Sequence, residues 1–171
     1  FIILNHKSIK MKKITLIFIS MLVFSCTPKA EKTPYQTGII KMEDAKSKRI
    51  IEFHQAYINN NFDSQMDLFS EDAVIHINAD DVSAKDMISG FAEGSQFYNN
   101  IQYKEWNTGT FILDDGSIFT NMWFTWSATS KATGVTLNNP VHNWMRWEGD
   151  KIVEGAFIFN PTDYIANMSS E

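Results

Sequence analysis

Apolar and polar residues alternate over four long segments in the second half of the chain, residues 101–113, 118–129, 135–147 and 152–159. The gaps between these segments contain glycine together with aspartate or serine, which are typical of tight turns. Alternation with this period places successive side chains on opposite faces of a strand. The pattern therefore predicts four consecutive strands joined by hairpins, which make an antiparallel sheet.

The first half of the chain has the longer period of helices. Apolar residues at Ile51, Phe53, Tyr57 and Ile58 form one stripe, which predicts a helix within residues 40–60. The other expected elements are a short helix over residues 64–69, a strand over 73–78, a helix over 83–97 and a short helix over 162–168. Helices followed by strands predict an α+β domain in which the helices cover one face of a curved sheet.

The beginning of the chain has the pattern of a secretory signal. Residues 14–24 are an apolar run that follows the basic start Met11-Lys12-Lys13. The run is shorter than the roughly 20 residues that a permanent membrane-spanning helix needs. We therefore expect residues 1–10 to lie upstream of the natural start, and residues 11–25 to be a cleaved signal peptide.

Cys26 is the only cysteine of the chain, and residues 23–26 (VFSC) resemble the lipobox of bacterial lipoproteins. That resemblance implies that Cys26 is lipidated and becomes the new N-terminus. We expect a protein of the bacterial cell envelope, lipid-anchored and facing the periplasm or the cell exterior. In this interpretation residues 26–44 are the lipidated cysteine with a flexible tether, and residues 45–171 are the folded domain. The alternative is ordinary secretion, with Cys26 removed or free.

The charge balance limits the classes of partner. Residues 1–25 contain four of the 15 basic residues and none of the 20 acidic ones, which leaves 11 basic against 20 acidic residues and a net charge of −9. Nucleic acids and anionic membrane surfaces are bound through clustered lysine and arginine. We therefore expect no nucleic-acid partner, and contact with a membrane only through the lipid anchor.

The order of the expected elements resembles the nuclear-transport-factor-2-like superfamily, and within it the SnoaL-like group. Three local pieces agree with that resemblance: residues 53–57 (FHQAY), 67–74 (DLFSEDAV) and 142–154 (HNWMRWEGDKIVE). The resemblance covers about residues 45–164. It implies a cystatin-like, cone-shaped antiparallel sheet packed against N-terminal helices, with a pocket inside the cone. The superfamily contains isomerases, dehydratases, epoxide hydrolases and polyketide cyclases, together with domains that only bind or dimerise.

The alternation of the strands predicts which side chains share a face. If Gly149 and Asp150 form a two-residue turn, His142, Trp144 and Arg146 lie on one face with Val153, Gly155 and Phe157. The same argument groups Val74, His76 and Asn78 on the first strand, and Asn121, Trp123 and Thr125 on the strand expected over residues 118–129. The superfamily pattern turns this face towards the pocket. The expected ligand-binding residues are Phe53, Tyr57, Asn78, Trp123, Trp144, Arg146 and Phe157.

His76 and His142 are the candidates for acid/base chemistry, because histidine exchanges a proton near neutral pH. Asp80, or its neighbour Asp81, is the candidate for a carboxylate at the mouth of the pocket. Each has a plain structural alternative: the histidines as hydrogen-bonded lining residues, and the aspartates as a solvated loop. Arg146 either binds a carboxylate ligand or pairs with a glutamate across its hairpin.

Other chemistries find little support in the sequence. Trp123, Thr125 and Phe157 stand where the epoxide-hydrolase-like branch has its arginine and two aspartates, and none of the three can do that chemistry. No catalytic triad order, phosphate loop or metal-ligand spacing is apparent, so we expect neither cofactor nor metal. The leading hypothesis is an envelope protein that binds a small, largely apolar molecule in an aromatic pocket. The alternatives are an isomerase, cyclase or hydratase, and an accessory module; a homodimer is expected.

Overall fold

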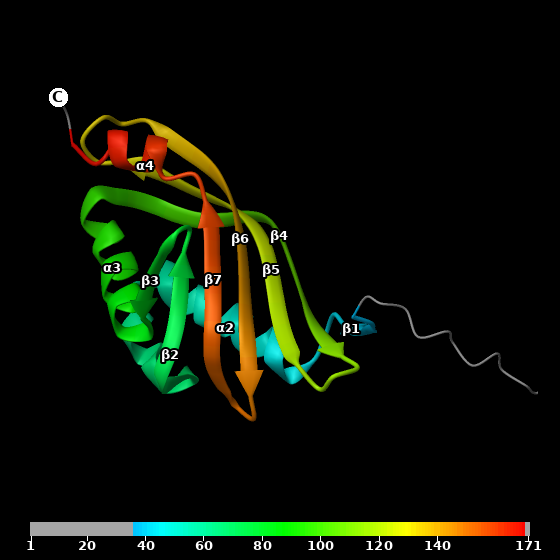
Figure 1. The fold of residues 1–171 in the computed structure, drawn as a ribbon. Coiled ribbons are helices and arrows are strands. Elements are labelled where there is room, and N and C mark those ends of the chain that lie inside the picture. Colours follow the sequence, from blue (N-terminus) through cyan, green and yellow to red (C-terminus); the bar gives the residue numbers. More distant parts are fainter. Residues whose placement is uncertain (1–35, 170–171) are drawn as a thin grey trace, which may run out of the picture. The chain divides into compact units, whose positions relative to one another are not determined.

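The computed structural model describes residues 36–169. The expected signal peptide, Cys26 and most of the expected tether lie outside the described residues. Within residues 36–169, no helix is long and apolar enough to span a membrane. Figure 1 shows one curved sheet with helix α2 packed behind it and helix α3 beside its β2–β3 end.

Seven strands form the sheet in the order β1-β4-β5-β6-β7-β2-β3. The strands are β1 (Gly38–Lys41), β2 (Phe69–Ile77), β3 (Asp80–Ser83), β4 (Tyr98–Leu113), β5 (Ile118–Ser130), β6 (Thr136–Glu148) and β7 (Lys151–Phe159). The four long strands follow one another through hairpins and pair antiparallel, as predicted. β2 returns to pair with β7 in parallel, which makes the sheet mixed.

Residues with capping side chains precede the two long helices, α2 (Ala45–Ile58) and α3 (Ala84–Phe97). The two short helices are the 3₁₀ helix η1 (Phe62–Leu68) and α4 (Thr162–Ala166), and neither has a side-chain cap. The side chain of Asp44 accepts a hydrogen bond from the Ser47 amide at 2.7 Å, and Ser83 accepts one from the Asp86 amide at 3.1 Å. These bonds satisfy amides that the first turn of each helix leaves free, and they fix where α2 and α3 start.

Two edge strands differ from the expectation. β1 lies within the segment expected to be a flexible tether, and it pairs with β4 from Gly38 opposite Leu113 to Lys41 opposite Thr110. β3 lies where a solvated loop was one interpretation, and its residue Asp81 pairs with His76 of β2. Both strands have four residues, too few to give an alternation that a sequence pattern can reveal.

The core lies between the helices and the face of the sheet that carries Ile75, Met122 and Met145, which we call the inner face. Ile50 and Phe53 of α2 are completely buried against it. The opposite side of the sheet is the outer face, and it carries half-exposed side chains such as Trp123 and Ile158.

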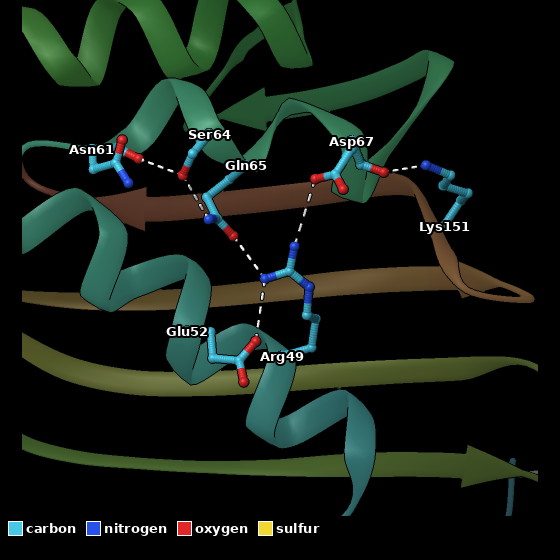
Figure 2. A network of polar contacts seen from close by, with 7 residues as sticks. All are labelled: Arg49, Glu52, Asn61, Ser64, Gln65, Asp67 and Lys151. Carbon is cyan, nitrogen blue, oxygen red and sulfur yellow. Dashed lines mark hydrogen bonds and ion pairs between the residues drawn. The ribbon is translucent and has the colours of Figure 1, made fainter.

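A polar network fastens α2 to η1 at the edge of this core (Figure 2). Arg49 donates to the side-chain oxygen of Gln65 at 2.8 Å and lies 3.6 Å from the carboxylate of Asp67. Lys151, just after the β6–β7 turn, donates to the backbone carbonyl of Asp67. The network thus joins α2 and η1 to the β6–β7 hairpin, which is distant from both in sequence.

Candidate functional site

A cavity of about 330 Å³ lies between α2, α3, α4 and the inner face of the sheet. Most of its wall is aromatic and includes Tyr57, Tyr103, Phe124, Trp126, Phe157 and Tyr164. They come from α2, β4, β5, β7 and α4, so the cavity exists only when the whole domain is folded. A pocket with such a wall and a few polar groups is typical of sites for small molecules.

A histidine lies behind one of the phenols. Nδ1 of His54 is 3.3 Å from the Tyr103 hydroxyl, and Nε2 is 3.3 Å from Oδ1 of Asn143. Asn143 in turn donates from Nδ2 to the backbone carbonyl of Ala156 at 2.9 Å. His54 is only 2 % exposed and Asn143 is completely buried. A buried chain of hydrogen bonds therefore runs from the backbone of β7 to a phenol on the cavity wall.

Burial determines the protonation state of His54. Removal from water lowers the pKa of His54 to about 4, although the hydrogen bond with Asn143 opposes the change. The ring lies among aromatic neighbours, with its centroid 5.2 Å from that of Phe53 and 5.1 Å from that of Phe124. The imidazole is therefore neutral near pH 7.

Three phenols line the cavity and all are neutral near pH 7. Burial raises the pKa of Tyr103 well above its usual value, and burial also raises the pKa of Tyr57. Burial raises the pKa of Tyr164 to about 12. The hydroxyl of Tyr57 accepts a hydrogen bond from Nε1 of Trp126 at 3.0 Å.

One carboxylate stands on the cavity wall. Asp86, in the first turn of α3, lines the cavity and accepts a hydrogen bond from the Ser83 hydroxyl at 2.7 Å. One turn later Gly90 also faces the cavity, and a Cβ added there would have no heavy atom within 4 Å. Within residues 36–169, no lysine or arginine lines this cavity.

Two of the residues expected to bind a ligand line the cavity, namely Tyr57 and Phe157. Phe53 is completely buried and packs in the core beside His54. Asn78 lies in the turn between β2 and β3 with φ 55°, where its side-chain oxygen accepts a hydrogen bond from the Phe159 amide at 2.9 Å. The Asn78 side chain therefore stabilises the turn and does not line the cavity.

The other expected residues lie on the outer face, not in the cavity. His76 contacts the carboxylates of Asp81 at 2.6 Å and Glu154 at 3.2 Å. These hydrogen bonds, first that of Asp81 and then that of Glu154, raise the pKa of His76. Asp80 is exposed at the start of β3. The only imidazole–carboxylate contacts among the described residues therefore lie outside the aromatic cavity, and His76 lines a second, more open pocket together with Arg146 and Glu154.

The outer face also carries the remaining candidates. The ring of His142 stacks on that of Trp123, with centroids 4.7 Å apart and an interplanar angle of 3°. Trp144 lies between Phe119 and His76. Arg146 forms ion pairs with Glu148 at 2.9 Å and Glu154 at 2.7 Å, which is the structural alternative that the sequence left open.

A β-bulge explains why the predicted pocket face was wrong. Trp147 pairs with Ile152 around the Gly149-Asp150 turn, but Arg146 pairs with Glu154, so Val153 is an extra residue. The bulge moves every later residue of β7 to the opposite face relative to β6. Phe157 consequently faces the cavity opposite Asn143, whereas Trp144 faces outward.

Sequence reasoning also missed His54, Tyr103, Trp126, Asn143 and Asp86. His54 lies about one helical turn before Tyr57 on α2, a spacing that places both side chains on the same side of the helix. Phe124 and Trp126 lie on the same face of β5, so the alternation of that strand would have identified both residues if its inner face had been known.

Within the described part of the chain, no group of three or more histidine, cysteine or acidic residues is placed to hold a metal ion.

Solved structures with the same arrangement are numerous. The AclR protein of Streptomyces galilaeus, a candidate hydroxylase, is 17% identical with a TM-score of 0.57, and the match covers 74% of this chain and 97% of that one. The same fold is therefore shared with that protein at low sequence identity. A candidate polyketide cyclase of Pseudomonas putida is 17% identical with a TM-score of 0.56, covering 73% and 98% of the two chains.

An NTF2-like protein of unknown function from Burkholderia pseudomallei is 12% identical with a TM-score of 0.55, covering 75% of this chain and all of that one. The described residues have the nuclear-transport-factor-2-like fold. No protein-family model matches the sequence, and no curated protein matches it either. The nuclear-transport-factor-2-like fold is thus established by structural similarity alone.

Proposed function

We propose that this SnoaL-like domain binds a small, largely apolar molecule in the aromatic cavity. The observation that carries the proposal is the wall itself: aromatic rings line a cavity of about 330 Å³, and burial raises the pKa of each of its three phenols. Burying apolar ligand surface against such a wall is favourable, at about 25 cal/mol per Å² removed from water.

Intrinsic tryptophan fluorescence tests this proposal, because Trp126 is on the cavity wall and Trp123 is on the outer face. The protein is titrated with alkylbenzenes, monoterpenes and steroids. We expect at least one of these classes to change the emission, and the change to disappear in Trp126→Phe but persist in Trp123→Phe. An emission change that persists in Trp126→Phe and disappears in Trp123→Phe would place the ligand on the outer face and contradict the proposal.

An enzyme of the isomerase, cyclase or hydratase type is the second candidate, and one observation favours it. The carboxylate of Asp86 lines the same cavity as the phenols of Tyr57 and Tyr103, so a base and hydrogen-bonding groups meet one space. The matching structures that carry enzyme names belong to other proteins and support this only by fold. Turnover of a bound compound that is lost in Asp86→Asn, with binding retained, would favour the enzyme.

We further propose that the domain is held at the bacterial envelope through lipidated Cys26, with a homodimer as its assembly. The lipobox-like residues 23–26 after an apolar run support the anchor. The test is metabolic labelling with palmitate in a bacterial host. We expect the label in the wild-type protein and none in Cys26→Ala, and unlabelled wild-type protein released to the medium would contradict the anchor.

A further inference from the structure

The hydrogen-bond chain behind Tyr103 has only one possible direction while His54 is neutral. The Ala156 carbonyl can only accept, so the Asn143 amide nitrogen must face it and the amide oxygen must face His54. That oxygen can only accept, so Nε2 of His54 carries the hydrogen. A neutral imidazole has one N–H, so Nδ1 is an acceptor and the Tyr103 hydroxyl donates to it.

The consequence for the cavity is that Tyr103 has used its only hydrogen. Its oxygen lone pairs remain, so Tyr103 presents an acceptor to a bound molecule. Tyr57 instead presents a donor. Its oxygen accepts a hydrogen bond from Trp126, and its own hydrogen has no acceptor among residues 36–169. The rings of Tyr57 and Tyr103 lie nearly parallel with centroids 6.0 Å apart, and both residues line the cavity.

We propose that Asn143 and His54 orient Tyr103 so that the cavity pairs an acceptor at Tyr103 with a donor at Tyr57 and thereby selects uncharged ligands that carry a hydroxyl group. This inference rests on the proposed binding function. A hydroxyl can donate to Tyr103 and accept from Tyr57, whereas an ether or a ketone can only accept and leaves Tyr103 unpaired. A carboxylate ligand is disfavoured because the cavity has Asp86 on its wall and, among the described residues, no lysine or arginine.

The test uses isothermal titration of three neutral probes of one ring system: naphthalene, 2-naphthol and 2-methoxynaphthalene, with 2-naphthoate as the anion. We expect the wild-type protein to bind 2-naphthol roughly fivefold more tightly than 2-methoxynaphthalene, the value of one net hydrogen bond. We expect 2-naphthoate to bind more weakly than naphthalene. The ratio of the naphthol and methyl-ether affinities is the decisive quantity, since the effect of the methyl group on fit is the same in every variant.

Two isosteric variants are the matched pair. Tyr103→Phe removes the acceptor, so the ratio is expected to fall about fivefold while naphthalene binding is kept. Tyr57→Phe removes the donor that serves both compounds, so both affinities fall and the ratio stays. A naphthol-to-methyl-ether affinity ratio that changes equally in the two variants would overturn the inference. A ratio that is the same in the wild-type protein and in Tyr103→Phe would also overturn it.

His54 is a positioning residue in this proposal, and His54→Phe tests that role. The substitution frees the Tyr103 hydrogen, which can then donate to the methyl ether, so the ratio is expected to fall with naphthalene binding kept. An unchanged ratio in a folded His54→Phe protein contradicts the role of His54, and if that variant does not fold the two tyrosine variants decide. Binding of naphthalene without a preference for 2-naphthol rejects this inference and leaves the proposed function standing, whereas no binding of any probe rejects both.

Discussion

Nε2 of His54 lies 3.3 Å from the side-chain oxygen of Asn143, in a part of the core where both residues are almost fully buried. The contact holds a neutral imidazole under the cavity without any carboxylate beside it, because the contacts of His54 among the described residues are Asn143, Tyr103 and aromatic rings. A proton on His54 therefore has no opposite charge to stabilise it in the folded state.

The stability of the domain should fall as the pH is lowered from 7 to 5. The pKa of His54 is about 4 in the folded state against 6.5 for the free side chain, so the unfolded state binds more protons throughout this range. The contribution of His54 to this loss in free energy of unfolding is about 2 kcal/mol, and urea denaturation at the two pH values measures the change.

Two controls isolate His54 in that experiment. His54→Gln should remove most of the pH dependence, and no change in slope would show that another group causes it. His76 acts in the opposite sense: its raised pKa gives stability that is present below pH 6.5 and is lost as the pH rises through the folded value. The same comparison in a His76→Gln background therefore removes the opposing contribution.

A second buried polar contact should be important for stability alone. Nε1 of Trp147 donates to the Thr120 hydroxyl at 2.9 Å, and Thr120 is completely buried. Thr120→Val keeps the shape but leaves the indole hydrogen unpaired, and we expect a loss of about 1–3 kcal/mol in urea denaturation. Thr125→Val, on the outer face of the same strand, is the control and should change stability by less than about 0.5 kcal/mol. Equal effects of the two substitutions would refute this assignment.

Gly155 lies where β7 passes closely over its neighbours. A Cβ at this position would overlap the sulfur of Met145 and lie 3.1 Å from the backbone oxygen of Trp144. We expect Gly155→Ala to destabilise the domain by about 1–3 kcal/mol through overpacking. Gly90→Ala is the matched control, because open space surrounds that site and alanine is the better helix former. A thermal melt in which Gly155→Ala is as stable as Gly90→Ala would contradict the packing.

The sequence predicted the elements of this domain much better than it predicted the site. The long strands have enough alternating residues to be recognised, and α2 and α3 begin at residues with capping side chains. The four-residue strand β1 has no such pattern, and it was expected to be part of a tether. Local patterns therefore predicted the elements that are long enough for their alternation or helical period to repeat.

The face of the sheet that lines the cavity could not be predicted, for two physical reasons. Both faces of β6 carry tryptophan, Trp144 outside and Trp147 inside, so apolar alternation does not mark which face is buried. The bulge at Val153 then changes which residues of β6 and β7 share a face, and no residue type in the sequence indicates that a bulge is present. The His54–Tyr103 contact joins residues 49 positions apart, which depends on the tertiary fold.

The aromatic cavity is the binding site in our proposal, and Gly90→Leu tests this central claim most directly. A leucine at this position enters open space on the cavity wall, and it replaces a glycine in a helix, so the domain should remain folded and at least as stable. Glu93→Leu adds the same side chain at an exposed position of α3 and is the control. The measurement is the affinity for naphthalene by isothermal titration. We predict that Gly90→Leu weakens binding at least tenfold and that Glu93→Leu leaves it unchanged; naphthalene binding that is undiminished in a folded Gly90→Leu protein would contradict the claim.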